Sequence, residues 1–353
     1  MLKKKTILVA PLHWGLGHAT RCIPIIKALL HHHFKVILAS DGAALQILQK
    51  EFPNLKSIEL PSYQITYPKK GGHFKWNMLL KSPMIFKAIS SEKKIIENLV
   101  SEGKIDGIIS DNRFGVRSSK IPSVYITHQL NVLTGNTSYL SSKIHQNIIN
   151  KFNECWVPDM VGSNNLSGKL GHISDSKLEI KYIGLLSRMT KKTIAKKNDV
   201  LLLLSGPEPQ RTLLEEKLFA LFKGKKQKVL LIQGHVKGEQ KMEQLDNITR
   251  YNYMLSTELE LAINGSEMVV SRSGYTTIMD MAKLNKKAFF IPTPGQYEQE
   301  YLAKRLSDLK IAPFCLQEEF TIDKLKNIDD YKGFKEINPV INYNDLFCLF
   351  EGK

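Results

Sequence analysis

The stretch that decides the fold runs from Val270 to Asp280 and reads VSRSGYTTIMD. Apolar residues 268–270 lead into it, so we expect a strand that ends in a short glycine-bearing turn and continues into a helix. Such a turn is either an ordinary connection with a capped helix, or a place where unpaired amides at the helix N-terminus meet a phosphate. Both interpretations predict a strand followed directly by a helix.

The same pattern of strand, helix and strand recurs on the N-terminal side of this block. Residues 5–10 and 35–40 are strand-like, and residues 23–30 between them have helical apolar spacing, which implies parallel pairing. The other strand candidates are residues 107–110, 124–127, 154–157, 200–204, 228–232 and 288–291. Polar and basic residues 190–199 separate two such series and indicate a linker. We therefore predict an α/β fold with two Rossmann-like domains.

The expected domains are residues 1–185 and 186–335, and residues 336–353 are expected to form a C-terminal helix that packs back on the first domain. The 353 residues are 42% hydrophobic and 24% charged, which is typical of a globular protein and excludes a disordered chain. No apolar run approaches the roughly 18 residues of a membrane-spanning helix. The N-terminus has no signal-peptide pattern, and the four cysteines have no C-x-x-C spacing, so we expect a cytoplasmic protein.

The net charge of +16 is unevenly distributed along the chain. Residues 1–190 carry 25 basic and 12 acidic side chains, whereas residues 191–353 carry 25 and 22. This excess indicates an anionic partner for the N-terminal half, such as a membrane surface, a nucleic acid or a phosphorylated ligand, unless it serves solubility alone. Residues 73–100 mix aromatic, aliphatic and basic side chains, interrupted by Pro83. They form either a membrane-surface segment or an ordinary surface helix.

The loop after the first strand, residues 11–18, reads PLHWGLGH. Gly15 and Gly17 let the backbone approach a ligand, but Thr20 replaces the third glycine of a dinucleotide fingerprint, so NAD is not expected. His18 directly follows these glycines, where an imidazole could take a proton from a substrate hydroxyl or could simply bond at the helix start.

Three further polar residues are candidates for the same crevice. Asp111 ends the strand at 107–110, where it could orient His18, bind the acceptor or form a plain turn. His128 ends the next strand and could contact substrate, and His13 could shape the acceptor side. Parallel strands deliver their C-terminal ends to one crevice, which is why these positions are singled out.

The block at 270–280 is followed by a P-x-P-x-x-x-x-Q-E motif at 292–300, and the N-terminal loop reads G-L-G-H-x-x-R at 15–21. Together these motifs resemble inverting GT-B glycosyltransferases, above all family 28, which includes the lipid-acceptor N-acetylglucosaminyltransferases of peptidoglycan synthesis. The resemblance implies two Rossmann-like domains with parallel sheets facing a cleft, the acceptor in the first and the nucleotide-sugar in the second. It implies transfer of a hexose or N-acetylhexosamine from a nucleoside-diphosphate sugar, with UDP expected, to a glycan or lipid-linked acceptor of the cell envelope. Peripheral attachment to the inner face of the plasma membrane through the basic N-terminal domain is also implied.

The resemblance also implies roles for individual residues. Ser273 and Gly274 bring a helix N-terminus to the diphosphate, and Ser271 and Arg272 shape that turn. Asp280 matches an acidic residue, commonly Glu in the family, that grips the ribose hydroxyls.

Gln299 and Glu300 match a Gln-Gln pair that contacts the donor sugar, and Glu300 departs from that pattern. Leu255 and Ser256 are placed beside the base, and Gly206 and Arg211 beside the phosphates. The donor-side set is completed by Gln233, Gly234 and Thr277.

The chemistry of the leaving group supports the same interpretation. A departing nucleoside diphosphate needs its negative charge stabilised, and a helix N-terminus with an arginine can do this without a metal or another cofactor. No Asp-x-Asp pair of the metal-dependent type occurs in the chain. The corresponding stretch also lacks the E-x7-E motif usual in retaining GT-B enzymes, so we expect a single displacement with one base. Two alternatives are a nucleotide-sugar 2-epimerase of the same fold, and a basic nucleic-acid-binding protein, for which no RNA-binding motif is present.

Overall fold

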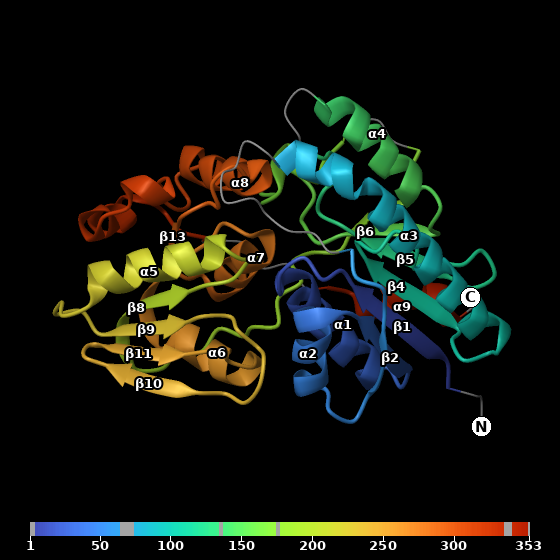
Figure 1. Ribbon diagram of the computed structural model, residues 1–353, viewed down its shortest axis with the longest axis horizontal. Helices are drawn as coiled ribbons and strands as arrows, with labels where there is room; N and C mark the ends of the chain where they lie inside the picture. The colour runs from blue at the N-terminus through green and yellow to red at the C-terminus, as the bar shows by residue number, and fades with distance from the viewer. Residues whose placement is uncertain (1–3, 64–73, 134–136, 174–176, 335–340, 352–353) are drawn as a thin grey trace.

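The apolar strands assemble into two separate sheets, one in each half of the chain (Figure 1). The computed structural model describes residues 4–63, 74–133, 137–173, 177–334 and 341–351. The described strands of the N-terminal lobe are β1 (Thr6–Pro11), β2 (Lys35–Ser40), β3 (Lys56–Glu59), β4 (Gly107–Asp111), β5 (Ser123–Ile126), β6 (Glu154–Val157) and β7 (Ile180–Tyr182). Its helices are α1 (Gly17–His31), α2 (Gly42–Glu51), α3 (Phe74–Ser101) and α4 (Ser138–Ile149).

The N-terminal sheet is parallel throughout, with the strand order β3-β2-β1-β4-β5-β6-β7. The buried side chains of β1 alternate between its two faces. Ile7 and Val9 pack in the same core as α1, whereas Leu8 and Ala10 pack with Ile96 of α3. Helices therefore cover both faces of the sheet, which explains why β1 is an uninterrupted apolar run.

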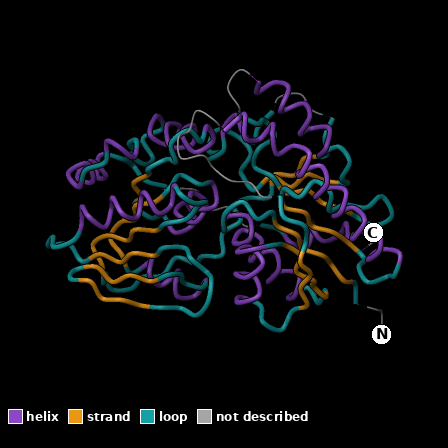
Figure 2. Tube along the Cα trace, in the orientation of Figure 1, coloured by secondary structure: helices purple, strands orange, loops and turns teal. Residues whose placement is uncertain are grey.

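The C-terminal lobe repeats this architecture with one added hairpin (Figure 2). Its sheet has the order β10-β11-β9-β8-β12-β13, parallel except for the antiparallel pair β10–β11, which the sequence pattern did not predict. Its described strands are β8 (Asn198–Leu203), β9 (Val229–Ile232), β10 (Met242–Leu245), β11 (Ile248–Tyr251), β12 (Ser266–Ser271) and β13 (Ala288–Phe290). Its helices are α5 (Gln210–Phe222), α6 (Ser256–Asn264), α7 (Tyr275–Leu284) and α8 (Tyr297–Asp308). The predicted α/β fold of two parallel-sheet lobes is confirmed.

The chain returns to the N-terminal lobe at its end. Residues 183–197 connect the lobes without regular secondary structure, and α9 (Tyr343–Glu351) follows the C-terminal lobe. Phe347 and Phe350 of α9 are buried with their rings 6.5 and 6.3 Å from that of Trp156 in β6. Lys5 also donates to the carbonyl of Phe350 at 2.6 Å. This helix therefore packs against the first sheet.

The segment at 73–100 falls largely within α3. The helix continues through Pro83. Ala88, Glu92 and Ile96 are buried against the lobe, whereas the side chains of residues 73–82 lie outside the described residues. Among the described residues, we find no helix with the length and hydropathy needed to cross a membrane.

The strand orders locate the functional region of each lobe. In the first sheet the order reverses between β1 and β4, and in the second between β8 and β12. Loops that leave such neighbouring strands in opposite directions open a crevice where ligands bind. The crevice of the first sheet holds the N-terminal glycine loop and Asp111. The crevice of the second sheet holds the turn at 271–274.

Candidate active site

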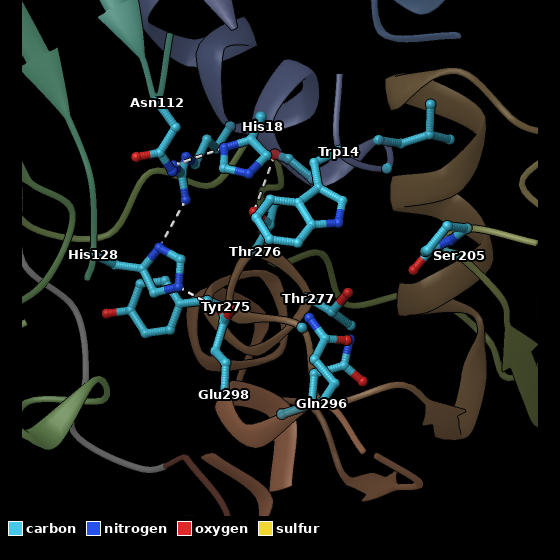
Figure 3. Close-up of a pocket in the computed structure, with 18 of the residues that line it drawn as sticks. Trp14, His18, Asn112, His128, Ser205, Tyr275, Thr276, Thr277, Gln296 and Glu298 are labelled. Atoms are coloured by element: carbon cyan, nitrogen blue, oxygen red, sulfur yellow. Dashed lines mark hydrogen bonds and ion pairs between the residues drawn. The ribbon is translucent and has the colours of Figure 1, made fainter. Parts of the chain in front are cut away.

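A hollow lies between the two lobes at these crevices (Figure 3). His18 and His128 of the N-terminal lobe line it opposite Tyr275, Thr276 and Glu298 of the C-terminal lobe. Its other lining residues are Trp14, Gly15, Leu16, Gly17, Arg21, Asn112, Gln129, Ser205, Gly206, Pro207, Gly274, Thr277, Gln296 and Gln299. Among the described residues, no three His, Cys, Asp or Glu side chains gather so that they could hold a metal ion.

His18 and Asp111 form a hydrogen-bonded pair at this hollow. The Nδ1 atom of His18 lies 2.7 Å from Oδ1 of Asp111, because α1 starts beside β1 and β4 is the next strand in the sheet. Arg21, one turn further along α1, donates from Nε and Nη2 to the two oxygens of Asp111 at 2.5 Å each. Both Asp111 and Arg21 are almost fully buried. Asp111 is thus a fixed carboxylate that holds the His18 ring in one orientation.

The electrostatics of this group leave His18 neutral and Asp111 ionised. Burial, followed by the charge of Arg21, lowers the pKa of His18 below its usual 6.5, although Asp111 acts in the opposite sense. Burial opposes ionisation of Asp111, but Arg21 and then His18 outweigh it and lower its pKa to about 2. Nδ1 of a neutral His18 lies closer to the ionised carboxylate of Asp111, at 2.7 Å, than to Nη2 of Arg21, at 3.0 Å. It therefore donates to Asp111, and Nε2 is left unprotonated. No described residue hydrogen-bonds to this Nε2, so it is available as a base.

Both ring nitrogens of His128 form hydrogen bonds with protein side chains. Its Nδ1 accepts from Nη1 of Arg21 at 3.0 Å, and its Nε2 lies 2.7 Å from Oε1 of Glu298. Because the guanidinium can only donate, His128 carries its proton on Nε2 and donates it to Glu298. Its ring also stacks on Tyr275 with 4.3 Å between ring centroids. His128 lines the hollow and its bonds join the two lobes, and its expected contact with substrate stays a prediction.

The N-terminus of α7 faces the same hollow. Its cap residue is Gly274, its first turn contains no acidic residue, and no described residue accepts a hydrogen bond from the amides of residues 274–277. Thr276 donates to the carbonyl of Gly17 at 3.0 Å, which holds this helix start against the N-terminal glycine loop. A Cβ at Gly17 would lie 3.2 Å from the Thr276 hydroxyl, which is closer than most real Cβ contacts. Free amides and a positive helix end together form a site for an anion.

A second hollow continues from the first along α7. Asp280, Thr277 and Gly234 line it, as do Met254 and Arg188. Asp280 accepts a hydrogen bond from Ser187 at 2.6 Å, and burial raises its pKa to about 6 although Arg188 acts against this. The Asp280 carboxylate thus lies further along the same helix whose N-terminus forms the anion site.

Two predicted donor-side arginines are directed away from these hollows. Arg211 donates to Glu208 at 2.5 and 2.8 Å and to Glu215 at 2.7 Å. Gln233 also donates to Glu215, at 2.5 Å. Because Arg211 is buried, its acidic neighbours neutralise it, and neither Arg211 nor Gln233 lines the hollows described.

Arg272 likewise bonds to protein groups and does not line the hollows. Its guanidinium donates to the carbonyls of Gln210, Ile291 and Pro292 at 2.8 to 3.2 Å, and burial lowers its pKa to about 9. Ser271 and Ser273 are buried, and Ser273 donates to the carbonyl of Gln299 at 2.8 Å. These three residues shape the turn, whereas Gly274 opens it to the hollow.

The start of α8 differs from the expected Gln-Glu arrangement. Gln299 lines the first hollow, with its Oε1 accepting from the amide of Thr293 at 2.9 Å. Glu300 turns away and accepts from the amide of Gly295 at 2.9 Å, so Glu300 does not face the hollow and Glu298 does.

The predicted base-side residues sit at the start of α6. Leu255 caps α6, and Ser256 donates to Glu51 of the other lobe at 2.5 Å. Neither lines the second hollow, although their neighbour Met254 does.

The remaining predicted acceptor-side residues lie at a third hollow. His13 lines it and has its Nδ1 3.2 Å from Asp41. Gly15 and Gly206, both at positive φ, face one another across it. This hollow shares Gly15 and Gly206 with the first one, so the two are continuous.

Sequence reasoning gave no role to Arg21, Arg188 or Glu298. An arginine within an amphipathic helix is normally a surface residue, and nothing local shows that Arg21 points inward. The signal that could have shown its inward orientation is that Arg21 follows His18 by three residues, which places both on the same face of the helix.

The comparisons with known proteins agree with this geometry. Residues 205–331 match the model of the Glycosyltransferase family 28 C-terminal domain. Two relatives are named UDP-N-acetylglucosamine--N-acetylmuramyl-(pentapeptide) pyrophosphoryl-undecaprenol N-acetylglucosamine transferase. That of Sulfurihydrogenibium sp. (strain YO3AOP1) is 26% identical over 42% of this chain and 43% of its own length. That of Bradyrhizobium sp. (strain BTAi1) is 32% identical over 20% of this chain and 19% of its own length. The matched parts span less than half of these relatives.

Solved structures match over almost the whole chain. The glycotransferase of kitacinnamycin has a TM-score of 0.62 at 13% identity, covering 100% of this chain and 94% of that one. MurG of Acinetobacter baumannii has a TM-score of 0.56 at 16% identity, covering 99% and 100%. At these identities the likeness shows the fold, and it confirms the predicted GT-B architecture.

Proposed function

On the premise of a GT-B fold whose C-terminal lobe is of the glycosyltransferase family 28 type, we propose that the protein is an inverting, metal-independent glycosyltransferase. It moves a hexose or N-acetylhexosamine from a nucleoside-diphosphate sugar, with UDP as the expected carrier, to a glycan or lipid-linked acceptor. The observation that carries this proposal is the free Nε2 of His18 facing the unpaired amides of α7 across one hollow.

The donor lies along α7 in this proposal. The diphosphate accepts hydrogen bonds from the amides at 274–277, where the positive helix end stabilises the charge that builds up as it departs. The nucleoside fills the second hollow, and Asp280 accepts from the ribose hydroxyls. A pKa of about 6 leaves Asp280 mostly ionised at neutral pH, as this role requires.

The transfer is a single displacement at the anomeric carbon. Nε2 of His18 takes the proton of the acceptor hydroxyl while its oxygen forms a bond to the anomeric carbon. The bond from that carbon to the diphosphate breaks, and the leaving group keeps the electron pair. Asp111 stabilises the imidazolium that forms, as Arg21 holds the carboxylate in place.

A panel of nucleoside diphosphates tests the donor site. We expect UDP at about 100 times its Kd to stabilise the protein by about 2.7 kcal/mol, which is visible as a raised Tm. Asp280→Ala weakens UDP binding by about tenfold or more, because it removes the ribose acceptor. The matched control is Asp308→Ala, an exposed aspartate of the same lobe.

Two outcomes of the panel oppose the proposal. Absence of binding by every nucleoside diphosphate and diphosphate sugar removes the donor site altogether. Isomerisation of a nucleotide-sugar without any acceptor favours the 2-epimerase instead.

The acceptor side is proposed to contact a membrane surface, since the relatives are named for a pyrophosphoryl-undecaprenol acceptor. An apolar patch on the N-terminal lobe suits this contact. It comprises Phe86 of α3 and Tyr139, Leu140 and Ile144 of α4, which are 55 to 77% exposed. Figure 1 shows α3 and α4 side by side, and Phe114 packs between their buried faces. Exposed lysines, Lys87 and Lys143, flank this α3–α4 patch.

We expect the protein to sediment with phosphatidylglycerol-containing vesicles, and less so as salt screens the lysines. Replacing Tyr139 and Leu140 together with serine reduces the bound fraction about tenfold or more, because apolar area is lost from the contact. Met242→Ser, which changes an exposed methionine of the other lobe, is the control. Equal sedimentation of all three proteins contradicts a role for the α3–α4 patch.

A further inference from the structure

Glu298 is an acidic side chain in the hollow for which the proposed reaction has no use. It lies in the first turn of α8, and its side chain remains 21% exposed. Oε1 accepts from His128 at 2.7 Å, whereas no described residue donates to Oε2. Figure 3 shows Glu298 between Tyr275 and Gln296, on the side of the hollow opposite His18. One carboxylate oxygen is therefore available to a ligand.

The charge on Glu298 is not cancelled by the cations around it. Arg21 donates to both oxygens of Asp111, and its other contacts are with ring nitrogens of His18 and His128. Burial opposes ionisation of Glu298, but His128, and then His18 and Arg21, outweigh it and lower its pKa. The two carboxylates and one guanidinium of this cluster give it a net negative charge at neutral pH.

The position of Glu298 places that charge beside the transferred sugar. Gln296 and Gln299 flank it on the same helix start, and the α7 amides line the same hollow. If the diphosphate occupies those amides and His18 faces the acceptor hydroxyl, the sugar joined to the diphosphate lies between them, next to Glu298. This step rests on the proposed function.

We propose that Glu298 is a specificity-determining residue that accepts a hydrogen bond from a hydroxyl of the transferred sugar and rejects sugars that carry a carboxylate. A hydroxyl satisfies Oε2 as a donor, whereas a uronate brings a second negative charge into the same poorly solvated space. Glu300 does not share this role, since its carboxylate is held by the amide of Gly295 outside the hollow.

Binding of two matched donors tests the inference without any acceptor. Calorimetry gives the Kd of UDP-glucose and of UDP-glucuronate, which differ in one charge at C6. We expect wild type to favour UDP-glucose by about tenfold or more, as expected for two like charges in partly buried surroundings. Glu298→Gln reduces this ratio to about threefold or less, because it removes the charge and keeps an oxygen that accepts from His128. Glu298→Asp retains the charge and most of the discrimination.

The control variant is Glu216→Gln, which makes the same charge change at an exposed position of α5 and leaves the wild-type ratio intact. An equal ratio in wild type and Glu298→Gln, with UDP itself binding both, overturns the role of Glu298. Failure of UDP to bind wild type contradicts the proposed function instead. Loss of UDP binding in Glu298→Gln alone also opposes the inference, since it shows that the residue supports the fold of the donor site.

Discussion

We expect His18→Gln to lower kcat by a factor of about 10²–10⁴, the usual contribution of a positioned general base. Glutamine still offers an amide donor to Asp111, but it has no atom that can take a proton in place of Nε2. The Kd of UDP stays within about twofold, because the proposed donor contacts are made by α7 and Asp280. Initial rates at saturating donor and calorimetric titration with UDP measure the two quantities.

The pH profile separates a base from a structural histidine. The pKa of His18 is lowered by burial and by Arg21, so the acid limb of kcat/KM lies below pH 6.5. As pH falls through that limb, Nε2 becomes protonated and the rate falls with it. His18→Gln removes this limb, whereas His31→Gln, a change at an exposed histidine later in the same helix, keeps both rate and profile. An unchanged kcat in His18→Gln would assign the proton transfer to another group.

The pairing of His18 with Asp111 could be predicted from the sequence because it follows from strand order. His18 lies in the first turn of α1, which follows β1, and Asp111 is the last residue of β4. β1 and β4 are neighbours at the point where the strand order reverses. The glycine turn before α7 was predictable for a similar reason, since its free amides depend only on a helix starting there. Strand order was sufficient to predict the first feature, and the position of a helix start was sufficient to predict the second.

The contacts of Arg21 and Arg272 could not be predicted in this way, because their partners are distant in the sequence. Arg272 is held by the carbonyls of Gln210, Ile291 and Pro292, and Arg21 by a carboxylate 90 residues away. A phosphate ligand and a buried carbonyl cluster both accept hydrogen bonds from a guanidinium, so residue type alone does not separate them. The choice between Glu298 and Glu300 depends on which way the first turn of α8 faces, and a spacing motif does not determine this.

Asp111→Asn is expected to damage both stability and turnover. It leaves Arg21 buried without its counter-charge, and breaking a buried ion pair in this way costs about 3–5 kcal/mol of the free energy of unfolding. It also frees the His18 ring to adopt the wrong tautomer, so kcat falls by about 10²–10⁴ in the protein that remains folded. Urea unfolding gives the first quantity, and rates normalised to folded protein give the second.

A double variant tests whether the lost stability arises from the ion pair between Asp111 and Arg21. Arg21→Met combined with Asp111→Asn removes both charges, and we expect the double variant to be more stable than the sum of the single changes by about 2 kcal/mol or more. Asp308→Asn, which breaks an exposed pair with Lys304, costs at most about 1 kcal/mol. Additive losses would mean that Asp111 and Arg21 are not coupled.

The pH dependence of stability gives the same pair an independent signature. The pKa of Asp111 is lowered to about 2 in the folded protein, from an ordinary value of 3.8. A lowered folded-state pKa stabilises the fold above the ordinary value, and that stabilisation is lost as pH falls from about 4 to about 2. Asp111→Asn should remove this part of the acid sensitivity while keeping the rest. Since the same carboxylate orients His18, the stability that Arg21 and Asp111 share is what keeps the base in place.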